Sequence, residues 1–262
     1  MDLGLTGRVA LILGASQGLG AASAHALAAE GVHVVVAARR RDVLDAVVAE
    51  IVAAGGSAEA IICDLGDSDS RQSVMDWIAN APRLDVLVAN SGGPKPGAAP
   101  GIASDTWRSE FESMVVGLIE IIDASVAKMR TSGFGRIIAI GSSGMSIPIP
   151  HLAVSNTLRS ALGGYMKSLA EQVASAGITC NMVLPGRIET DRTQQIDALN
   201  AQKMGVSVAE VQAKSAATIP AGRYGQPQEL ASVVAFLASE QAAYVTGSHL
   251  RVDGGFIRNM HT

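Results

Sequence analysis

The segment VALILGASQGLG, residues 9–20, joins a short apolar run to the start of a helical pattern. VALIL has the Val/Ile/Leu-rich composition of a strand that is covered on both faces. Gly14, Gly18 and Gly20 follow in a G-x-x-x-G-x-G spacing, and glycines let a backbone turn sharply and approach a phosphate closely. A helix that begins here would stabilise such an anion with its N-terminus. The segment therefore predicts a strand, a phosphate-binding turn and a helix, although the glycines alone also fit a plain turn.

The same alternation of apolar runs and helical patterns continues outward along the chain. Strands are expected at 9–13, 32–37, 58–62, 85–89, 136–140, 178–183 and 248–252, and helices at about 18–30, 41–54, 69–80, 104–131, 153–175 and 227–239. Repeated β–α alternation implies right-handed crossovers and a doubly wound α/β sheet. Ligands in such sheets bind beyond the carboxyl ends of the strands, where the strand order reverses.

Composition excludes several classes of function. A chain of 262 residues with 48% hydrophobic content can bury the core of one large domain. Its formal net charge of −4 and the lack of an extended Lys/Arg cluster argue against a nucleic-acid or membrane-surface role. Cys63 and Cys180 lie in apparent strands without metal-ligand spacing, which predicts core thiols and no metal. No signal peptide or membrane span is recognised, so we expect a soluble cytoplasmic protein.

The end of the second strand indicates which dinucleotide the fold would prefer. There VVVAARRR places Ala38 before Arg39, where an NAD-binding fold normally has a carboxylate for the ribose 2′-hydroxyl. Ala38 cannot repel a 2′-phosphate, and the guanidinium of Arg39 can bind one. NADP(H) is therefore the predicted cofactor, with NAD(H) as the alternative. Residues 39–41 also fit the solvated start of a helix, and Gln17 stands where a second basic residue often helps.

The order of motifs resembles that of the short-chain dehydrogenase/reductase family over nearly the whole chain. The pieces are the Gly14–Gly20 loop, CDL, ANSGG, GRIIAIGSS, AGITCNMVLPGRIET, IPAGRYGQPQELASVVAFLAS and YVTGSHLRVDGG. Within the family, these motifs most resemble those of the β-ketoacyl-acyl-carrier-protein reductases. The resemblance implies one α/β domain, residues 1–262, that is Rossmann-like and doubly wound with a mostly parallel seven-stranded sheet. It also implies a small-molecule carbonyl substrate.

The resemblance assigns cofactor contacts to this chain. Asp64 could accept from the adenine amino group, and Asn90 could fix the loop above the nicotinamide. The backbone of Ile188 and the hydroxyl of Thr190 would hold the carboxamide, unless the preceding Pro-Gly pair is a mere strand-ending turn. The expected cofactor-binding residues are Gly14, Ser16, Gln17, Gly18, Leu19, Gly20, Arg39, Asp64, Leu65, Asn90, Gly92, Arg159, Pro185, Gly186, Ile188 and Thr190.

The catalytic positions depart from the family pattern. The family transfers a hydride while a tyrosine supplies the proton, a lysine lowers the pKa of that tyrosine, a serine holds the substrate oxygen and an asparagine anchors a relay water. Ser142 matches the serine. Counting onward from it places Ser155 at the tyrosine and Arg159 at the lysine, and counting from Trp107 places Met114 at the asparagine. The expected catalytic residues are therefore Ser142, Ser155 and Arg159.

These departures weaken acid catalysis without excluding it. A serine hydroxyl is a poor acid and arginine stays protonated, and a general acid is worth roughly 10²–10⁴ in rate. The motif SNTLR (155–159) with the loop GGPKPG (92–97) resembles a divergent subgroup, which favours a modified site over a decayed one. His151 or Lys95 could supply a proton, although each also fits a surface residue. Tyr165 is about 15 Å further along the helix and is expected to pack between helices.

The prediction is thus an NADP(H)-dependent, 3-oxoacyl-acyl-carrier-protein reductase-like oxidoreductase that reduces a ketone through a modified site. A cofactor-binding protein with little redox activity, serving as a sensor or a structural partner, is the alternative; a non-redox reaction on bound cofactor is a third interpretation. Residues 191–226 could form a substrate lid or a peripheral helical excursion. The small-residue helices 104–131 and 153–175, with the family-like C-terminus, predict a homotetramer.

Overall fold

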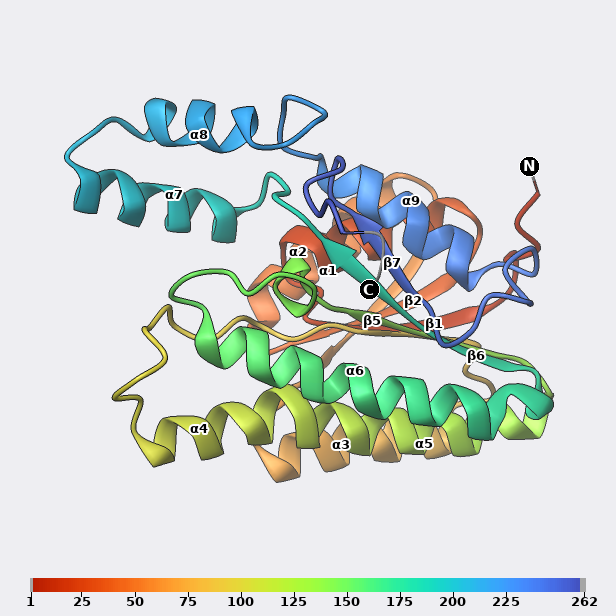
Figure 1. Cartoon of the computed structure of the whole chain (residues 1–262). Coiled ribbons are helices and arrows are strands. Elements are labelled where there is room, and N and C mark those ends of the chain that lie inside the picture. The colour runs from red at the N-terminus through yellow and green to blue at the C-terminus, as the bar shows by residue number, and fades with distance from the viewer. Residues whose placement is uncertain (1, 260–262) are drawn as a thin grey trace.

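Seven strands form one parallel sheet in the order β3-β2-β1-β4-β5-β6-β7 (Figure 1). The computed structural model describes residues 2–259, so Met1 and residues 260–262 of the predicted domain lie outside the described residues. The strands are β1 (Val9–Leu13), β2 (His33–Ala38), β3 (Ser57–Ile62), β4 (Val86–Ala89), β5 (Gly135–Ile140), β6 (Ile178–Pro185) and β7 (His249–Val252). The expected Rossmann-like α/β sheet is confirmed, and each pairing of these strands is parallel. The strand order reverses between β1 and β4.

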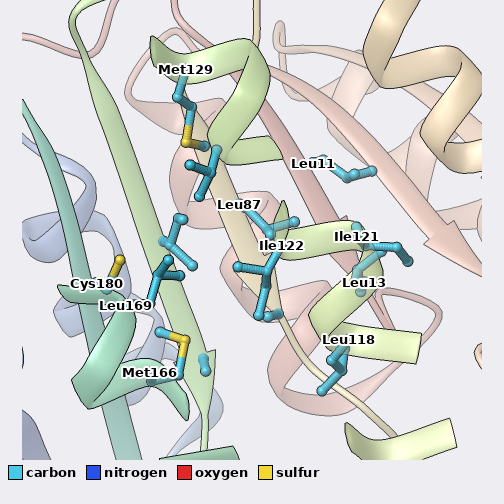
Figure 2. Close-up of a cluster of buried hydrophobic side chains, with 14 of the residues drawn as sticks. Leu11, Leu13, Leu87, Leu118, Ile121, Ile122, Met129, Met166, Leu169 and Cys180 are labelled. Atoms are coloured by element: carbon cyan, nitrogen blue, oxygen red, sulfur yellow. The ribbon is translucent and has the colours of Figure 1, made fainter. Parts of the chain in front are cut away.

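Helices cover both faces of this sheet, as its non-alternating apolar strands require (Figure 1). One face carries α1 (Gly18–Ala29), α2 (Arg41–Ala53) and α9 (Pro227–Ala238), and the other carries α3 (Ser68–Asn80), α4 (Ser104–Phe111), α5 (Gly117–Ser132) and α6 (Ala153–Val173). Figure 2 shows part of the core on the second face, to which Leu87 of β4, Ile122 of α5 and Leu169 of α6 all contribute. Cys180 lies in this core, and burial raises the pKa of its thiol to about 12.

The single helix predicted over 104–131 is wrong in one respect, because a π-helical turn at Glu112–Val116 interrupts it. Arg71 is buried and binds both Glu112 and Glu120 at 2.7 Å. Positions eight apart lie about 80° from each other around a regular α-helix, whereas a turn with one extra residue brings them within about 20°. The wide turn thus brings both glutamates to Arg71, an arrangement that hydrophobic spacing alone does not reveal.

Two helices of the predicted lid region, α7 (Asp191–Met204) and α8 (Val208–Ala217), extend away from the layered body (Figure 1). Their base is held by Asp197, which is fully buried and accepts from Arg187 at 2.8 Å and from the hydroxyl of Tyr224 at 2.9 Å. The helical content expected between residues 191 and 226 is confirmed. No helix among residues 2–259 is long and apolar enough to cross a membrane.

Candidate active site

The carboxyl ends of strands β1 to β6 open into a cleft of about 790 Å³ at the point where the strand order reverses. Of the predicted site residues, those that line it are Gly14, Ser16, Gln17, Gly18, Leu19, Arg39, Asp64, Leu65, Asn90, Gly92, Ser142, Ser155, Arg159, Pro185, Gly186, Ile188 and Thr190. Gly20 lies just beneath this lining, in the first turn of α1. The structure thus brings the predicted residues together, while the role of each stays a prediction.

The glycine turn after β1 is shaped by two close approaches. Gly14 and Gly18 have φ of 61° and 57°, a backbone region that favours glycine. A Cβ on Gly20 would overlap the carbonyl oxygen of Gly14, so only glycine lets the loop fold onto α1. The side-chain amide of Asn90 donates to that same carbonyl at 3.2 Å, which fixes the turn to the end of β4. No side chain caps α1, so its first N–H groups are available to an anion in the cleft.

The end of the cleft that follows β2 carries two arginines. Arg39 and Arg40 both line it, and Arg40 donates to the side chain of Gln17 at 2.7 Å. This hydrogen bond places the guanidinium of Arg40 next to Gln17, whose own side chain is uncharged. Arg41 instead pairs with Asp45 at 2.7 Å on the outside of α2, as expected for a solvated helix start. Sequence analysis singled out Arg39 alone, because a basic run does not show which of its members face the cleft.

Asp64 lies on the same rim, in the turn after β3. Its carboxylate accepts from the backbone N–H of Gly66 at 3.0 Å, and its own N–H donates to the hydroxyl of Ser70 at 2.8 Å. Cys63 beside it is buried, and burial raises the pKa of its thiol to about 11. The turn therefore presents one fixed carboxylate and no reactive thiolate to the cleft.

The opposite end of the cleft holds the three predicted catalytic residues. Ser142 follows β5 and accepts from the N–H of Gly144 at 3.0 Å, which leaves its own proton free to donate. Ser155 is buried in the first turn of α6, and Arg159 lies one turn further on. Arg159 donates to the carbonyl of Ile140 at 2.7 Å and to that of Ser91 at 3.4 Å. It therefore joins the ends of β4 and β5 to α6.

The charge on Arg159 persists in this setting. Burial, with a smaller effect from the nearby Arg192, lowers the pKa of Arg159 to about 10. A group with this pKa remains protonated at neutral pH, so the cleft contains a fixed cation beside the two serines. Its predicted contact with a ribose is compatible with this position, and the hydrogen bonds that the structure itself shows go to backbone carbonyls.

Comparisons with known proteins identify the family. A family model described as enoyl-(acyl carrier protein) reductase matches residues 14–257. The 3-oxoacyl-[acyl-carrier-protein] reductase of Synechocystis sp. is 36% identical over 256 residues, which cover 97% of this chain and 98% of that protein. The chain belongs to the short-chain dehydrogenase/reductase family. The predicted family and the similarity to 3-oxoacyl-acyl-carrier-protein reductases are therefore confirmed.

Solved structures of this family agree with the fold. YwfH, an NADPH-dependent reductase involved in bacilysin biosynthesis, has a TM-score of 0.92 and 30% identity, with 97% of this chain and 99% of that chain covered. The L-sorbose reductase of Gluconobacter frateurii, solved with NADPH and L-sorbose, has a TM-score of 0.93 and 29% identity over 99% of this chain and 100% of its own.

Three further residues were considered as site residues from the sequence: Met114, His151 and Lys95. Only Met114 lines the cleft. Met114 lies in the π-helical turn, lines the cleft and packs with Val154 of α6, so it offers an apolar surface there. His151 has an exposed side chain outside the cleft lining, and its carbonyl accepts from Gly97 at 2.7 Å. Lys95 is exposed and also outside the lining. The placement favours neither His151 nor Lys95 as a proton donor.

Tyr165 packs between helices, as predicted. Its hydroxyl donates to the carboxylate of Asp123 on α5, and burial with this bond raises the pKa of the phenol well above its usual range. The phenol therefore stays protonated and outside the cleft lining.

Sequence analysis missed Arg192, which follows the family-like PGRIET segment. It lines the cleft from the second position of α7 and donates to the carbonyl of Pro94 at 2.6 Å. Its position in the polar stretch after β6 gives no periodic signal. The contact across 98 positions of sequence is visible only in the fold.

Proposed function

We propose that this short-chain dehydrogenase/reductase is an NADP(H)-dependent oxidoreductase that reduces a ketone to a secondary alcohol through a modified catalytic site. The observation that carries the proposal is the partly buried guanidinium of Arg159 at the end of the cleft that also holds Ser142 and Ser155. The similarity to 3-oxoacyl-acyl-carrier-protein reductases and to a sugar reductase solved with NADPH supports the reaction type. Neither similarity identifies the substrate.

The residues at the adenosine end fit a dinucleotide with a 2′-phosphate. The glycine turn and the uncapped start of α1 would hold the pyrophosphate. Glycine is required at position 20 for this turn, because a Cβ there would overlap the carbonyl oxygen of Gly14. Arg39 and Arg40 would hold the 2′-phosphate, and Asp64 lies where the adenine amino group is expected. Bound NADPH would supply a hydride to the carbonyl carbon, and a solvent proton would complete the alcohol.

The chain's own residues would bind and polarise the carbonyl. The hydroxyl of Ser142 can donate to the substrate oxygen, because its lone pair already accepts from Gly144. Arg159 keeps its proton and would stabilise the negative charge that develops on that oxygen. Ser155 would act as a spacer or a relay to solvent. Catalysis without a stronger acid forgoes roughly 10²–10⁴ in rate.

Replacing Arg159 with alanine is expected to weaken NADPH binding about 10-fold and to remove turnover, because the cation and two bonds to backbone carbonyls are lost. Ser155→Ala, the matched change one turn earlier on α6, should reduce turnover much less. Calorimetric titration with NADPH and steady-state oxidation of NADPH measure both effects, and Arg159→Lys shows whether a retained charge preserves the fold. If Arg159→Ala changes neither binding nor turnover, residues 155–159 are only helix surface and the proposal is wrong.

Replacing Arg39 with alanine is expected to weaken NADPH binding about 10-fold and to leave NADH binding unchanged, since only the former carries the 2′-phosphate. Arg41→Ala is the matched control, because Arg41 is paired with Asp45 outside the cleft. Calorimetric titration of all three proteins with both cofactors gives the comparison. Equal or reversed affinities of the unaltered protein for NADPH and NADH would contradict the predicted preference.

A cofactor-binding protein with little redox activity is the second candidate, and the apolar Met114, which lines the same cleft as Ser155, favours it. Steady-state NADPH oxidation with β-keto thioesters, diketones and quinones separates the two. Turnover of any of these supports the reductase, whereas NADPH binding without turnover supports the second candidate. We further propose that α7 and α8 form a substrate lid and that the chain assembles as a homotetramer in the cytoplasm.

A further inference from the structure

Two arginines from different helices donate hydrogen bonds to one short loop, at the end of the cleft that holds the predicted catalytic residues. Arg159 of α6 donates to the carbonyl of Ser91, and Arg192 of α7 donates to the carbonyl of Pro94. Both guanidiniums line the cleft, and they lie close enough for Arg192 to contribute to the lowered pKa of Arg159. Two positive charges therefore lie near each other at the loop that follows β4.

Neither arginine is in an ion pair within residues 2–259, where the charged contacts involve other arginines and two histidines. The carboxylates that line the same cleft are Asp64, Glu110 and Asp191, and none of them contacts either guanidinium within 4.0 Å. Two partly buried cations without a counter-ion are costly, and that cost falls when an anion occupies the space between them.

The donors of Arg192 remain available for such an anion. A guanidinium has five N–H donors, and within the described chain Arg192 uses one of them, from Nη2 to Pro94. Gly93 lies directly against this guanidinium, since a Cβ there would be in ordinary contact with the same Nη2 atom at 3.6 Å. The remaining edge of the guanidinium has the planar geometry that binds a carboxylate through two parallel hydrogen bonds.

We infer that the substrate is a carbonyl compound that also carries a carboxylate, and that Arg192, supported by Arg159, is the residue that selects it. This inference rests on the proposed reductase function and names its substrate class. The pyrophosphate of the cofactor has its own cradle at the start of α1, and the 2′-phosphate has Arg39 and Arg40. The groups proposed to bind the two phosphates of the cofactor therefore do not include Arg192, which leaves this cation for another anion.

The test uses matched pairs of 3-oxo, 4-oxo and 5-oxo acids with their methyl esters, which share the carbonyl and differ in charge. NADPH oxidation by the unaltered protein is expected to favour at least one acid over its ester by about 10- to 100-fold in kcat/KM. Arg192→Met should remove this preference by raising the KM of the acid alone, and Arg192→Lys should retain part of it. Arg130→Met, a change on the exposed face of α5, should behave as the unaltered protein does.

Other outcomes overturn the inference while leaving the proposed function intact. Equal kcat/KM for every acid and its ester would show that no carboxylate is recognised. An equal loss of NADPH affinity and of acid selectivity in Arg192→Met would assign Arg192 to the cofactor.

If no carbonyl compound is reduced, the proposed function fails, and binding decides the inference separately. Calorimetric titration of the NADP⁺-loaded protein with succinate, glutarate and inorganic phosphate then gives the answer. Dicarboxylate binding that Arg192→Met weakens 10-fold or more would support the carboxylate site. Tighter binding of phosphate, or no binding of a dicarboxylate, would refute it.

Discussion

The double substitution Ser155→Tyr with Arg159→Lys is expected to raise the rate of carbonyl reduction by about 10²–10⁴-fold, the usual contribution of a positioned general acid. Ser155 lies in the first turn of α6 and lines the cleft, so a longer side chain at this position can project into the cleft. A lysine at position 159 can still donate to the carbonyl of Ile140 and keep a positive charge near the new phenol. That charge lowers the pKa of the tyrosine and makes it a better acid.

Steady-state oxidation of NADPH by the unaltered protein, each single variant and the double variant measures this gain. Met114 limits it, because a thioether cannot anchor a relay water as an amide would. Adding Met114→Asn to the double variant should therefore raise the rate further. Normal NADPH binding without any gain in rate on the panel of carbonyl compounds would show that the missing acid is not the only obstacle.

Replacing Asp85 with alanine is expected to lower the free energy of unfolding by about 3 kcal/mol, since it removes the buried member of an ion-pair network. Asp85 precedes β4, is fully buried and accepts from Arg83 at 2.6 and 2.7 Å. It also accepts from Arg8 at 3.3 Å and from the backbone N–H of Val9 at 2.9 Å. Alanine leaves this N–H and part of the arginine charge without a partner.

Urea unfolding of the unaltered protein, Asp85→Ala and Asp85→Asn gives the comparison. Asparagine keeps an oxygen for the N–H of Val9 and loses the charge, so its cost should be about half as large. A loss below about 1 kcal/mol for Asp85→Ala would mean that solvent already screens the network, as it does for exposed pairs.

The sequence predicts the strands and most helix limits because their signals are local. Apolar runs such as VALIL report burial on both faces, and glycines mark the turn after β1. The predicted site residues come mostly from the resemblance to the family, and the general rule that strand ends meet at one edge of a parallel sheet places them together. The cleft contains each of them except Gly20, which shapes it from below.

Features set by distant pairs were not predictable in this way. The π-helical turn at 112–116 brings Glu112 to Arg71, which lies about forty positions earlier, and no spacing within the helix reveals it. The contact of Arg40 with Gln17 and that of Arg192 with Pro94 join segments whose separation is settled only by the sheet topology. A single sequence shows which side chains could bind an anion, and the fold shows which of them face the cleft.

The hydrogen bond between Arg192 and Pro94 ties α7 to the loop after β4, and it must break whenever these two walls of the cleft separate. The network of Arg187, Asp197 and Tyr224 at the base of α7 is centred on a fully buried carboxylate and would act as the pivot of the proposed lid. Openings of this kind take microseconds to milliseconds in enzymes and often set the turnover rate. A carboxylate bound to the remaining edge of the Arg192 guanidinium would add a second partner beside Pro94, so the loaded protein would be held shut more firmly than the free one. Release of product, rather than its formation, would then limit any variant whose chemistry has been accelerated.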